Sequence, residues 1–483
     1  MPQPRINIIL LGRCKMTKLK KHKLIEINWP EFGQCDRPPR STAEEFQGRI
    51  NAVRRMMKAR RLTHLVVYAD REHFANLAYL TGFDPRFEES VLVIGLESSP
   101  LLVVGNECAG YLTVSPLYRA GKLRHELFQP FSLLNQPRNK SRFLHKILAD
   151  EGIGEKSLVG CVGWKYFAES EHPTGVHATD IPAYLADTLR ELAGPDMVVN
   201  STDILMHPDY GLRTFCSPSE IAYFEFTNIL ASEGMKQMLL GIRAGMVDYN
   251  LVKLAGYNGE PLGCHLTMVS GANRDQGLSS PIGARIKRGD PFATNLCYWG
   301  SNACRAGWVA ESAADLPANA RNYINDFAGP YFAAMREWFR LLKIGTKGSA
   351  LSDIIAQNLP YNKFGIFLNA GHLIHLDEWL SSPIYPGSNI RIHSGMVIQS
   401  DVIPSSKRYF STRMEDGFAI ADKNLRAKLR KQFPACYQRC QKRREFMNSI
   451  LGIELSEDVL PLSNITGIVP PFLLKPQMIL AIK

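Results

Sequence analysis

Along residues 41–206, stretches with helical spacing of apolar residues alternate with short, continuously apolar runs. The segment STAEEFQGRINAVRRMMKARR has helical periodicity and begins with capping-box spacing, from Ser41 to Glu44 and from Thr42 to Glu45. The runs LTHLVVYA, SVLVIGLE, PLLVVGN and SLVGCVGW are β-rich and are bounded by Gly, Pro, Asp or Glu. This pattern predicts an α/β domain over residues 41–206, preceded by an N-terminal extension over residues 1–40.

Residues 207–483 show a different order of elements. Ser217, Pro218 and Glu220 fit the N-cap, first and third positions of a long helix, and Gly245 is expected to end it. The β-rich runs CHLTMVSG, DPFATNLCYWG and CRAGWVAES precede a helix predicted at about 320–342, and GMVIQSDVIP and RYFSTRMEDGFAIAD follow it. Strands grouped around helices in this way predict an α+β domain with a curved antiparallel sheet.

The end of this domain, about 423–483, is expected to form a basic tail. Residues 423–446, KNLRAKLRKQFPACYQRCQKRREF, have the pattern of one amphipathic helix with a basic outer face. Together with KMTKLKKHK near the start, they contribute much of the net charge of +11. No recognition motif accompanies this charge, so we expect a solvated helix face rather than a nucleic-acid contact.

Targeting signals are not evident in the sequence. No run of eighteen or more apolar residues exists, which predicts that the chain does not span a membrane. The basic cluster near the start follows the apolar patch, the reverse of a secretory signal, and we expect Met16 to be the true start. The ten cysteines have no CxxC pair, so we expect reduced thiols in a cytoplasmic protein.

Candidate chemistry gathers in the second domain. Asp401 and Glu415 lie in apolar runs, and His372 and His375 lie in the segment NAGHLIHLDEW. A buried carboxylate must be paired, protonated or bound to a metal. His372, Asp401 and Glu415 would together form a three-ligand site for one divalent transition metal. The alternative is that each side chain is hydrogen-bonded within its strand.

Seven segments follow one another along residues 41–422: NLAYLTGF, SPSEIAYF with ASEGMKQMLLGIRAGM, VSGANRDQGLSSP, RGDPFATNL, AGHLIHLDE, SGMVIQSDVIP and RMEDGFAIAD. In this order they resemble the creatinase, aminopeptidase P and prolidase superfamily. The resemblance implies a small N-terminal domain and a catalytic domain with the pita-bread fold. It also implies a homodimer, in which the N-terminal domain of one subunit can reach the site of the other.

The resemblance further implies two metal ions that activate a shared water, held by two Asp, one His and two Glu. Here the first Asp position falls on Asn295, and the second falls on Cys304 or Arg305, of which the arginine would repel a cation. The other three positions fall on His372, Asp401 and Glu415. The changes predict the loss of the dinuclear centre, leaving no metal or a single divalent ion.

Creatinase resembles these peptidases but uses no metal, and it also has Asn at the first Asp position. Its general-base histidine falls on Ser279 here, and a second superfamily histidine falls on Trp379, so two proton-transfer groups are missing. Arg86 lies near the position of an arginine with which creatinase binds its substrate carboxylate. We predict that Arg86, Asn295, His375 and Trp379 bind substrate. The alternatives are a surface arginine, a structural histidine and a tryptophan packed in the core.

These features predict a hydrolase-like enzyme of the creatinase or Xaa-Pro aminopeptidase type. It would cleave a C–N bond in a small or peptide-like substrate without a dinuclear metal centre, with His372, Asp401 and Glu415 as catalytic residues. Two alternatives stay open. One is a catalytically inactive protein that keeps the fold as a peptide- or protein-binding scaffold. The other is a lyase that uses one metal in the same pocket.

Overall fold

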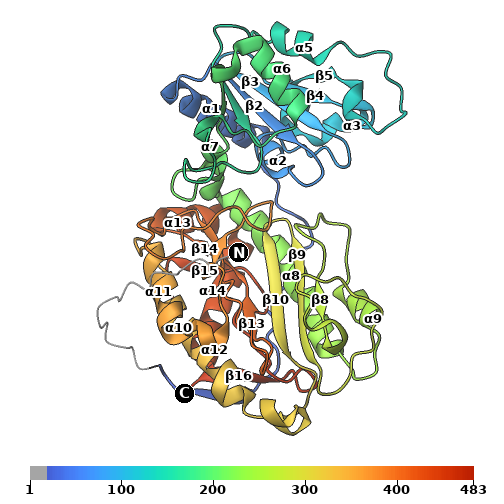
Figure 1. Cartoon of the computed structure of the whole chain (residues 1–483). Coiled ribbons are helices and arrows are strands. Elements are labelled where there is room, and N and C mark those ends of the chain that lie inside the picture. Colours follow the sequence, from blue (N-terminus) through green and yellow to red (C-terminus); the bar gives the residue numbers. More distant parts are fainter. Residues whose placement is uncertain (1–18) are drawn as a thin grey trace.

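The computed structural model describes residues 19–483, in which a smaller N-terminal domain lies above a larger second domain (Figure 1). The predicted start at Met16 lies outside these residues. The mixture of helices and antiparallel sheets predicted from the sequence is confirmed. Among the described residues, no helix has both the length and the apolar character that crossing a bilayer requires. Their nine cysteines are all free thiols.

The N-terminal domain is built on a six-stranded mixed sheet in the order β5-β4-β3-β2-β6-β7. The strands are β2 (His64–Ala69), β3 (Ser90–Gly95), β4 (Leu101–Val104), β5 (Arg124–Leu127), β6 (Val159–Val162) and β7 (Val198–Asn200). The helices are α1 (Ala43–Ala59), α2 (Ala75–Thr81), α3 (Asn106–Tyr111), α4 (Pro116–Arg119), α5 (Leu144–Asp150), α6 (Ala183–Ala193) and α7 (Asp203–Met206).

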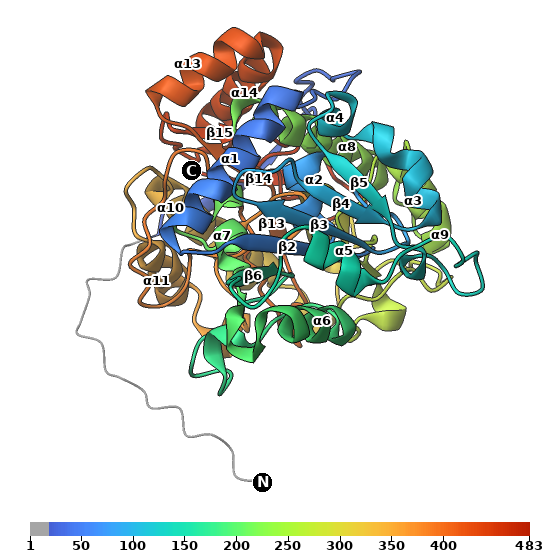
Figure 2. The same ribbon diagram turned by 90° about the horizontal axis from the view of Figure 1, so that it is seen from above.

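Helices cover both faces of this sheet, which explains why its strands read as continuously apolar runs. Leu65 and Val67 of β2 belong to the core cluster that includes the buried face of α1. Val66 and Tyr68 point to the other face and pack in the cluster that includes α5 and α6. Seen from above, α1 and α6 lie on opposite sides of the sheet (Figure 2). At the start of α1, Thr42 is the N-cap and accepts a hydrogen bond from the Glu45 amide.

The second domain begins with the long helix α8 (Pro218–Gly241), which starts at the boundary between the domains and packs along β9 and β10 (Figure 1). The predicted start is confirmed, because Ser217 and Glu220 form a reciprocal capping box. The predicted stop at Gly245 is wrong. The helix ends at Gly241, since the backbone of Ile242 already has extended dihedral angles.

Two four-stranded sheets follow, in the orders β13-β10-β9-β8 and β11-β12-β14-β15. Their strands are β8 (Met268–Val269), β9 (Pro291–Tyr298), β10 (Ser301–Trp308), β11 (His372–Leu373), β12 (Val397–Gln399), β13 (Arg413–Glu415), β14 (Gly417–Ile420) and β15 (Val459–Pro461). The other helices before the C-terminal region are α9 (Asp248–Val252), α10 (Gly329–Leu341), α11 (Gly348–Asn358) and α12 (Tyr361–Phe364). The predicted helix at 320–342 is shorter, because a π-helical turn at Ile324–Ala328 precedes α10.

The region predicted as a basic tail is part of the folded domain. Its single predicted helix is two helices, α13 (Lys423–Gln432) and α14 (Pro434–Phe446), because Pro434 lacks the amide proton that would continue α13. After them, β15 joins a central sheet, and β16 (Met478–Ile482) pairs with β1 (His22–Glu26) of the predicted extension. Part of the basic charge is structural, since Arg439 and Arg443 contact the buried Glu225 carboxylate.

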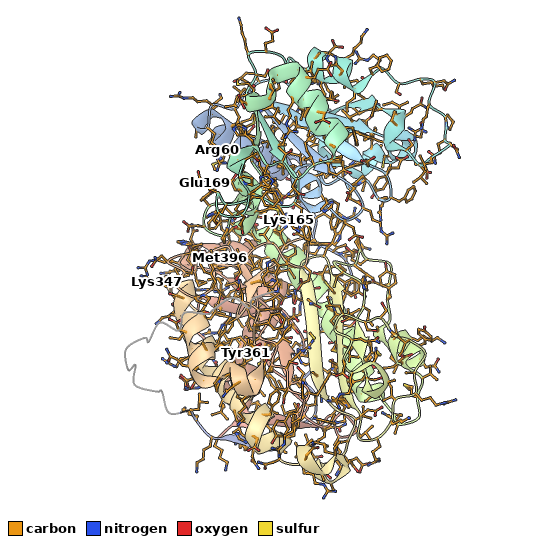
Figure 3. The ribbon with its side chains drawn as sticks, viewed as in Figure 1. Arg60, Lys165, Glu169, Lys347, Tyr361 and Met396 are labelled. Atoms are coloured by element: carbon orange, nitrogen blue, oxygen red, sulfur yellow. The ribbon has the colours of Figure 1, made fainter. Side chains whose placement is uncertain are left out.

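Ion pairs and hydrogen bonds hold the two domains together at their boundary. Arg213 is completely buried, pairs with Asp377 and donates to the Asn76 side-chain oxygen of α2. Arg49 of α1 lies 3.2 Å from a carboxylate oxygen of Glu220 in α8. Arg60 and Lys165 lie near the lower side of the N-terminal domain, and Met396 lies across the boundary in the second domain (Figure 3).

Candidate active site

Strand register brings three positions of the site into one row. In the antiparallel pairs β9–β10 and β10–β13, Cys304 lies directly opposite both Asn295 and Glu415. Directly opposed residues point to the same face of a sheet, so all three side chains face the same side. The structure therefore decides between Cys304 and Arg305 as the residue in this row, in favour of Cys304.

Arg305 points to the opposite face because side chains alternate along a strand. Its guanidinium lies 2.7 Å from the Asp416 carboxylate and donates to the carbonyl oxygens of Ile465 and Ile468. The expectation that Arg305 repels a cation in the site is therefore wrong. This arginine holds β10 to the C-terminal segment of the chain.

His372 meets Asp401 and Glu415 at the end of this row. One donor atom from each of these three buried residues lies within 4.8 Å of the others. His372 lies in β11, Asp401 follows β12 and Glu415 ends β13. Gly371 precedes the histidine with φ +112°, and a side chain there would come within 2.9 Å of the Gln399 carbonyl oxygen. Glycine is thus required for the backbone to enter β11.

The imidazole of His372 is held on several sides. Its Nδ1 lies 3.1 Å from the Leu373 carbonyl oxygen, which places the proton on Nδ1. Its Nε2 lies 3.4 Å from Glu378 Oε1 and 3.9 Å from Asp401 Oδ2. Trp379 stacks on the ring at 4.1 Å and 14°. Burial disfavours the charged ring, but the Glu378 carboxylate outweighs it and raises the pKa of His372 above its ordinary value.

Burial has the largest effect on the pKa of both carboxyl groups, Asp401 and Glu415. It raises the pKa of Asp401 to about 6 and raises the pKa of Glu415 well above its ordinary value, and the proximity of Asp401 adds to the latter effect. The Asn302 side chain donates to Glu415 Oε1 at 2.9 Å. Two negative charges in one buried pocket repel each other, so the pocket favours a proton or a cation between them.

Asn302 and Glu378 also belong to the site. From the sequence, Glu378 was noted only as one of two acidic residues that follow the histidines and could take part in acid/base chemistry, and Asn302 was not assigned. Asn302 of β10 lies opposite Cys297 of β9 and lies 3.4 Å from Glu378 Oε1. Glu378 is 25% exposed and connects the buried histidine to the surface. The sequence signal for Glu378 is its closeness to His372. Asn302 can be assigned to the site only when the register of β9 and β10 is counted outward from the Trp299–Gly300 turn that joins them.

The residues at the first two aspartate positions do not fit a second metal ion. The Asn295 Oδ1 atom accepts hydrogen bonds from the Thr267 amide at 2.6 Å and the Thr267 hydroxyl at 2.9 Å. Its amide nitrogen lies 3.4 Å from Cys264 Sγ. The Cys304 thiol lies 3.5 Å from a cationic nitrogen of Arg413. A neutral amide with an occupied oxygen, and a thiol beside a guanidinium, are poor ligands for a cation.

One metal ion does fit the remaining three residues. His372 Nε2 and Asp401 Oδ1 are buried and have no hydrogen-bond partner among residues 19–483. Buried polar atoms normally have partners, and imidazole with two carboxylates is a suitable donor set for Zn²⁺, Fe²⁺ or Mn²⁺. A bound cation would give both of these unpartnered atoms a partner.

Of the predicted substrate-binding residues, Asn295 and Trp379 lie at this cluster. His375 is buried at the domain boundary, where its Nε2 lies 3.2 Å from Glu220 Oε1. Arg86 is on the N-terminal domain, where it contacts Asp84 and the Tyr111 hydroxyl. Within one chain, the structure does not bring Arg86 or His375 into contact with His372. Their roles stay predictions.

No protein-family model and no curated protein sequence matches the chain. Solved structures do match. The prolidase from Pyrococcus horikoshii OT3 covers 77% of this chain and 95% of its own at 15% identity, with a TM-score of 0.59. The Xaa-Pro dipeptidase from Bacillus anthracis covers 78% and 96% at 12% identity and 0.59. A substituted Escherichia coli aminopeptidase P in complex with substrate covers 81% and 100% at 16% identity and 0.52. At sequence identities of 12–16%, the structural similarity shows that this chain shares the fold of these proteins.

Proposed function

We propose that this chain, which has the pita-bread fold of the creatinase, aminopeptidase P and prolidase superfamily, is a hydrolase that cleaves a C–N bond in a small or peptide-like substrate. The observation that supports this most is the buried cluster of His372, Asp401 and Glu415, whose donor atoms lie within 4.8 Å of one another. Buried, unpartnered titratable groups are costly for stability, and they are typical of sites that perform chemistry.

We further propose that the cluster holds one divalent cation. When bound, such an ion supplies Lewis-acid polarisation and lowers the pKa of a coordinated water. The first two aspartate positions, Asn295 and Cys304, would not hold a second ion. Their side chains instead form the neutral wall of the pocket, against which an uncharged part of the substrate can lie.

The chain's own residues supply the proton transfer. Burial alone would raise the pKa of Glu378, but the nearby His372 outweighs it and keeps this pKa below its ordinary value. Glu378 is therefore ionised near neutral pH and accessible to water, as a general base requires. Asn302 contacts both Glu378 and Glu415 and keeps the two carboxylates in place. Trp379 covers one face of His372, which narrows the pocket and favours a small or flat substrate.

The predicted roles of Arg86 and His375 in substrate binding depend on assembly. Arg86 is exposed on the N-terminal domain. In a homodimer, Arg86 of one subunit can reach the active site of the other subunit. The homodimer itself, the cytoplasmic location and the lack of a nucleic-acid partner remain predictions from the sequence.

A binding scaffold without catalysis is the second candidate. The stacking of Trp379 on His372 at 4.1 Å supports it, because a covered imidazole is less accessible to substrate. The loss of both aspartates at Asn295 and Cys304 supports it as well. The predicted one-metal lyase would use the same cluster, and its products differ from those of a hydrolase because no water is added.

The test compares His372→Ala with His393→Ala, a half-exposed histidine that contacts Asp209 away from the cluster. Both proteins and the wild type are incubated with Xaa-Pro dipeptides and small amides in the presence of Zn²⁺ or Mn²⁺. We expect water-dependent amine release by the wild type and by His393→Ala, and a loss of about 100-fold or more in His372→Ala. Binding of these peptides without turnover by the wild type would favour the scaffold. An unsaturated product would favour the lyase.

A further inference from the structure

Two thiols lie close together at the wall of the candidate active site. Cys297 of β9 faces the same side of the sheet as Asn295, two residues away, and lies directly opposite Asn302 of β10. Cys264 lies in the segment that precedes β8, and its Sγ atom lies 3.4 Å from the Asn295 amide nitrogen. Both sulfurs therefore border the row of residues that faces the proposed metal cluster, although neither thiol belongs to that cluster.

An irregularity in the sheet turns Cys264 toward Cys297. The segment before β8 pairs with β9 through Leu262 and, six residues later, through Met268, whereas the two partners in β9 are only four residues apart. The segment therefore carries two extra residues, which form a bulge. In a regular pairing Cys264 would point to the face opposite to Cys297, because side chains alternate along a strand. A bulge breaks this alternation and re-aims the side chain.

Gly263 makes room for the sulfur of Cys297. The Gly263 amide donates to the Cys297 carbonyl oxygen at 3.3 Å, so the two residues lie opposite each other. A Cβ atom on Gly263 would come within 2.8 Å of Cys297 Sγ. This sulfur thus occupies the space that a side chain at position 263 would fill, immediately beside Cys264 in the chain.

The two thiols differ in exposure and in acidity. Cys264 is partly exposed, and among the described cysteines only Cys35 shares this property. The Cys297 thiol, followed by the Asn295 amide, lowers the pKa of Cys264 below its ordinary value, although burial and the Glu378 carboxylate oppose this effect. Burial, with a further contribution from Cys264, raises the pKa of Cys297 well above its ordinary value. Cys264 is therefore the more reactive thiol, and Cys297 is inert until Cys264 has reacted.

We propose that Cys264 and Cys297 form a reversible disulfide when the protein meets a peroxide. The Cys264 thiolate attacks one peroxide oxygen, so that an S–O bond forms and the O–O bond breaks. The hydroxide that leaves takes up the proton of the thiol and becomes water. The Cys297 sulfur then attacks the sulfenic sulfur of Cys264, so that the S–S bond forms and the S–O bond breaks. This second hydroxide leaves as water with the Cys297 proton.

In total, one peroxide is reduced to two waters and two thiols are oxidised to one disulfide. The new bond would link the bulged segment to β9 beside Asn295, and the Asn295 amide would lose its contact with a free thiol. The wall of the candidate site would thus differ between the reduced and the oxidised protein. This modification site does not depend on the proposed function.

The first test maps the disulfide in the wild-type chain. Reduced protein is treated with hydrogen peroxide near neutral pH, remaining thiols are blocked with N-ethylmaleimide, and peptides are analysed by mass spectrometry without a reductant. We expect one peptide pair linked through Cys264 and Cys297, lighter by two hydrogen atoms and separated again by dithiothreitol. Absence of this pair after oxidation would overturn the proposal, and so would a link from Cys264 to the buried Cys304 instead.

The second test assigns the order of the two steps with Cys264→Ser and Cys297→Ala. Cys35→Ser is the matched control, because Cys35 is also partly exposed and contacts only the Arg37 carbonyl oxygen, at 3.2 Å. Dimedone, which traps sulfenic acids, should label Cys264 at least about fivefold more in Cys297→Ala than in the wild type, because the resolving thiol is missing. Cys264→Ser should form no linked pair, and Cys35→Ser should form it like the wild type.

Equal dimedone labelling of Cys264 in the wild type and in Cys297→Ala would contradict the role of Cys297. Sulfenic acid on Cys297 in the Cys264→Ser protein, at the level of Cys264 in Cys297→Ala, would contradict the order of the steps. The map of the wild-type chain needs no substitution, so it decides the proposal even where replacement of the buried Cys297 prevents folding.

Discussion

Two side chains, Asn295 and Cys304, separate this site from a dinuclear centre. The register of the sheet places them in one row with Glu415. Their positions therefore suit metal ligands, but their side chains do not. The Asn295 side-chain oxygen accepts hydrogen bonds from Thr267, and the Cys304 thiol lies beside Arg413. The retained cluster around His372 faces this row. In the proposed single-metal site, the residue types at these two positions, and not the fold, set the number of metal ions.

This account predicts that Asn295→Asp combined with Cys304→Asp creates a second metal site. Two carboxylates would then face Glu415 from neighbouring strands, which is the ligand type that a divalent cation requires. We expect the double variant to bind one more equivalent of Zn²⁺ or Mn²⁺ than the wild type, measured by titration of metal-free protein. The isosteric control Asn295→Asp/Cys304→Ser should not gain a full equivalent. An unchanged stoichiometry in the double variant would show that the backbone, and not only the side chains, has departed from a two-metal arrangement.

At the scale of elements, buried charges join strands and helices that are distant in sequence. Arg305 of β10 is 1% exposed and connects the sheet to Asp416 and to the carbonyl of Ile465. Arg49 of α1 and Glu220 of α8 form a comparable link between the domains. Such pairs contribute little over apolar packing when intact, but removal of one partner leaves a buried charge without compensation.

We therefore expect Arg305→Met to lower the free energy of unfolding by about 3–5 kcal/mol, because the Asp416 carboxylate and four carbonyl oxygens lose a hydrogen-bond donor. Urea unfolding measures this change. Arg430→Met on the exposed face of α13 is the matched control and should change stability by less than about 0.5 kcal/mol. A similar, small effect of both substitutions would mean that the arginine does not hold the C-terminal segment to the sheet.

The link between the domains predicts a pH dependence. Burial would raise the pKa of Glu220, but Arg49 outweighs it and lowers this pKa from 4.5 to about 2. A carboxylate with a lowered folded-state pKa stabilises the protein above its unfolded-state pKa of 4.5, and this contribution is lost as the pH falls toward 2. Glu220→Gln keeps the capping box but removes the charge. We expect it to cost about 3 kcal/mol at neutral pH, measured by chemical unfolding, and the difference from the wild type to shrink below pH 4.5. A difference that stays constant with pH would contradict this prediction.

The ends of helix α8 and the register of β9 and β10 differ in how far the sequence predicts them. The start of α8 followed from Ser217 and Glu220, because a capping box is a local interaction between residues three apart. The end of α8 was misplaced, because the backbone already becomes extended at Ile242, and Gly245 with its positive φ belongs to the loop that follows. Asn302 was missed for a related reason. Its place in the site depends on which residues of β9 it faces, and only the tight turn between the strands determines that register.

In the whole molecule, the two ends of the described chain pair with each other. β1 and β16 form a two-stranded sheet over five residue pairs, and Ile479, Leu480 and Ile482 are buried. This pairing was not predicted from the sequence, which was divided into an extension, two domains and a basic tail. The two strands are more than four hundred residues apart, and no local pattern connects them.

A chain that ends at residue 475 should therefore be strongly destabilised. Loss of three buried aliphatic side chains of β16 removes roughly 5 kcal/mol or more of apolar burial. Thermal unfolding should begin at a much lower temperature than in the full chain. A chain lacking only the exposed Lys483 is the control and should unfold like the full chain. If the shorter chain unfolded at an unchanged temperature, the C-terminal region would be an appendage, as the sequence alone suggested.

Metal stoichiometry tests the central claim most directly. Metal-free wild-type protein and His372→Ala are titrated with Zn²⁺ and with Mn²⁺, and bound metal is measured by elemental analysis after gel filtration. The cluster of His372, Asp401 and Glu415 predicts one equivalent in the wild type and none in His372→Ala. Two equivalents in the wild type, none in the wild type, or one equivalent that survives the loss of His372 would each contradict a single-metal site at this cluster.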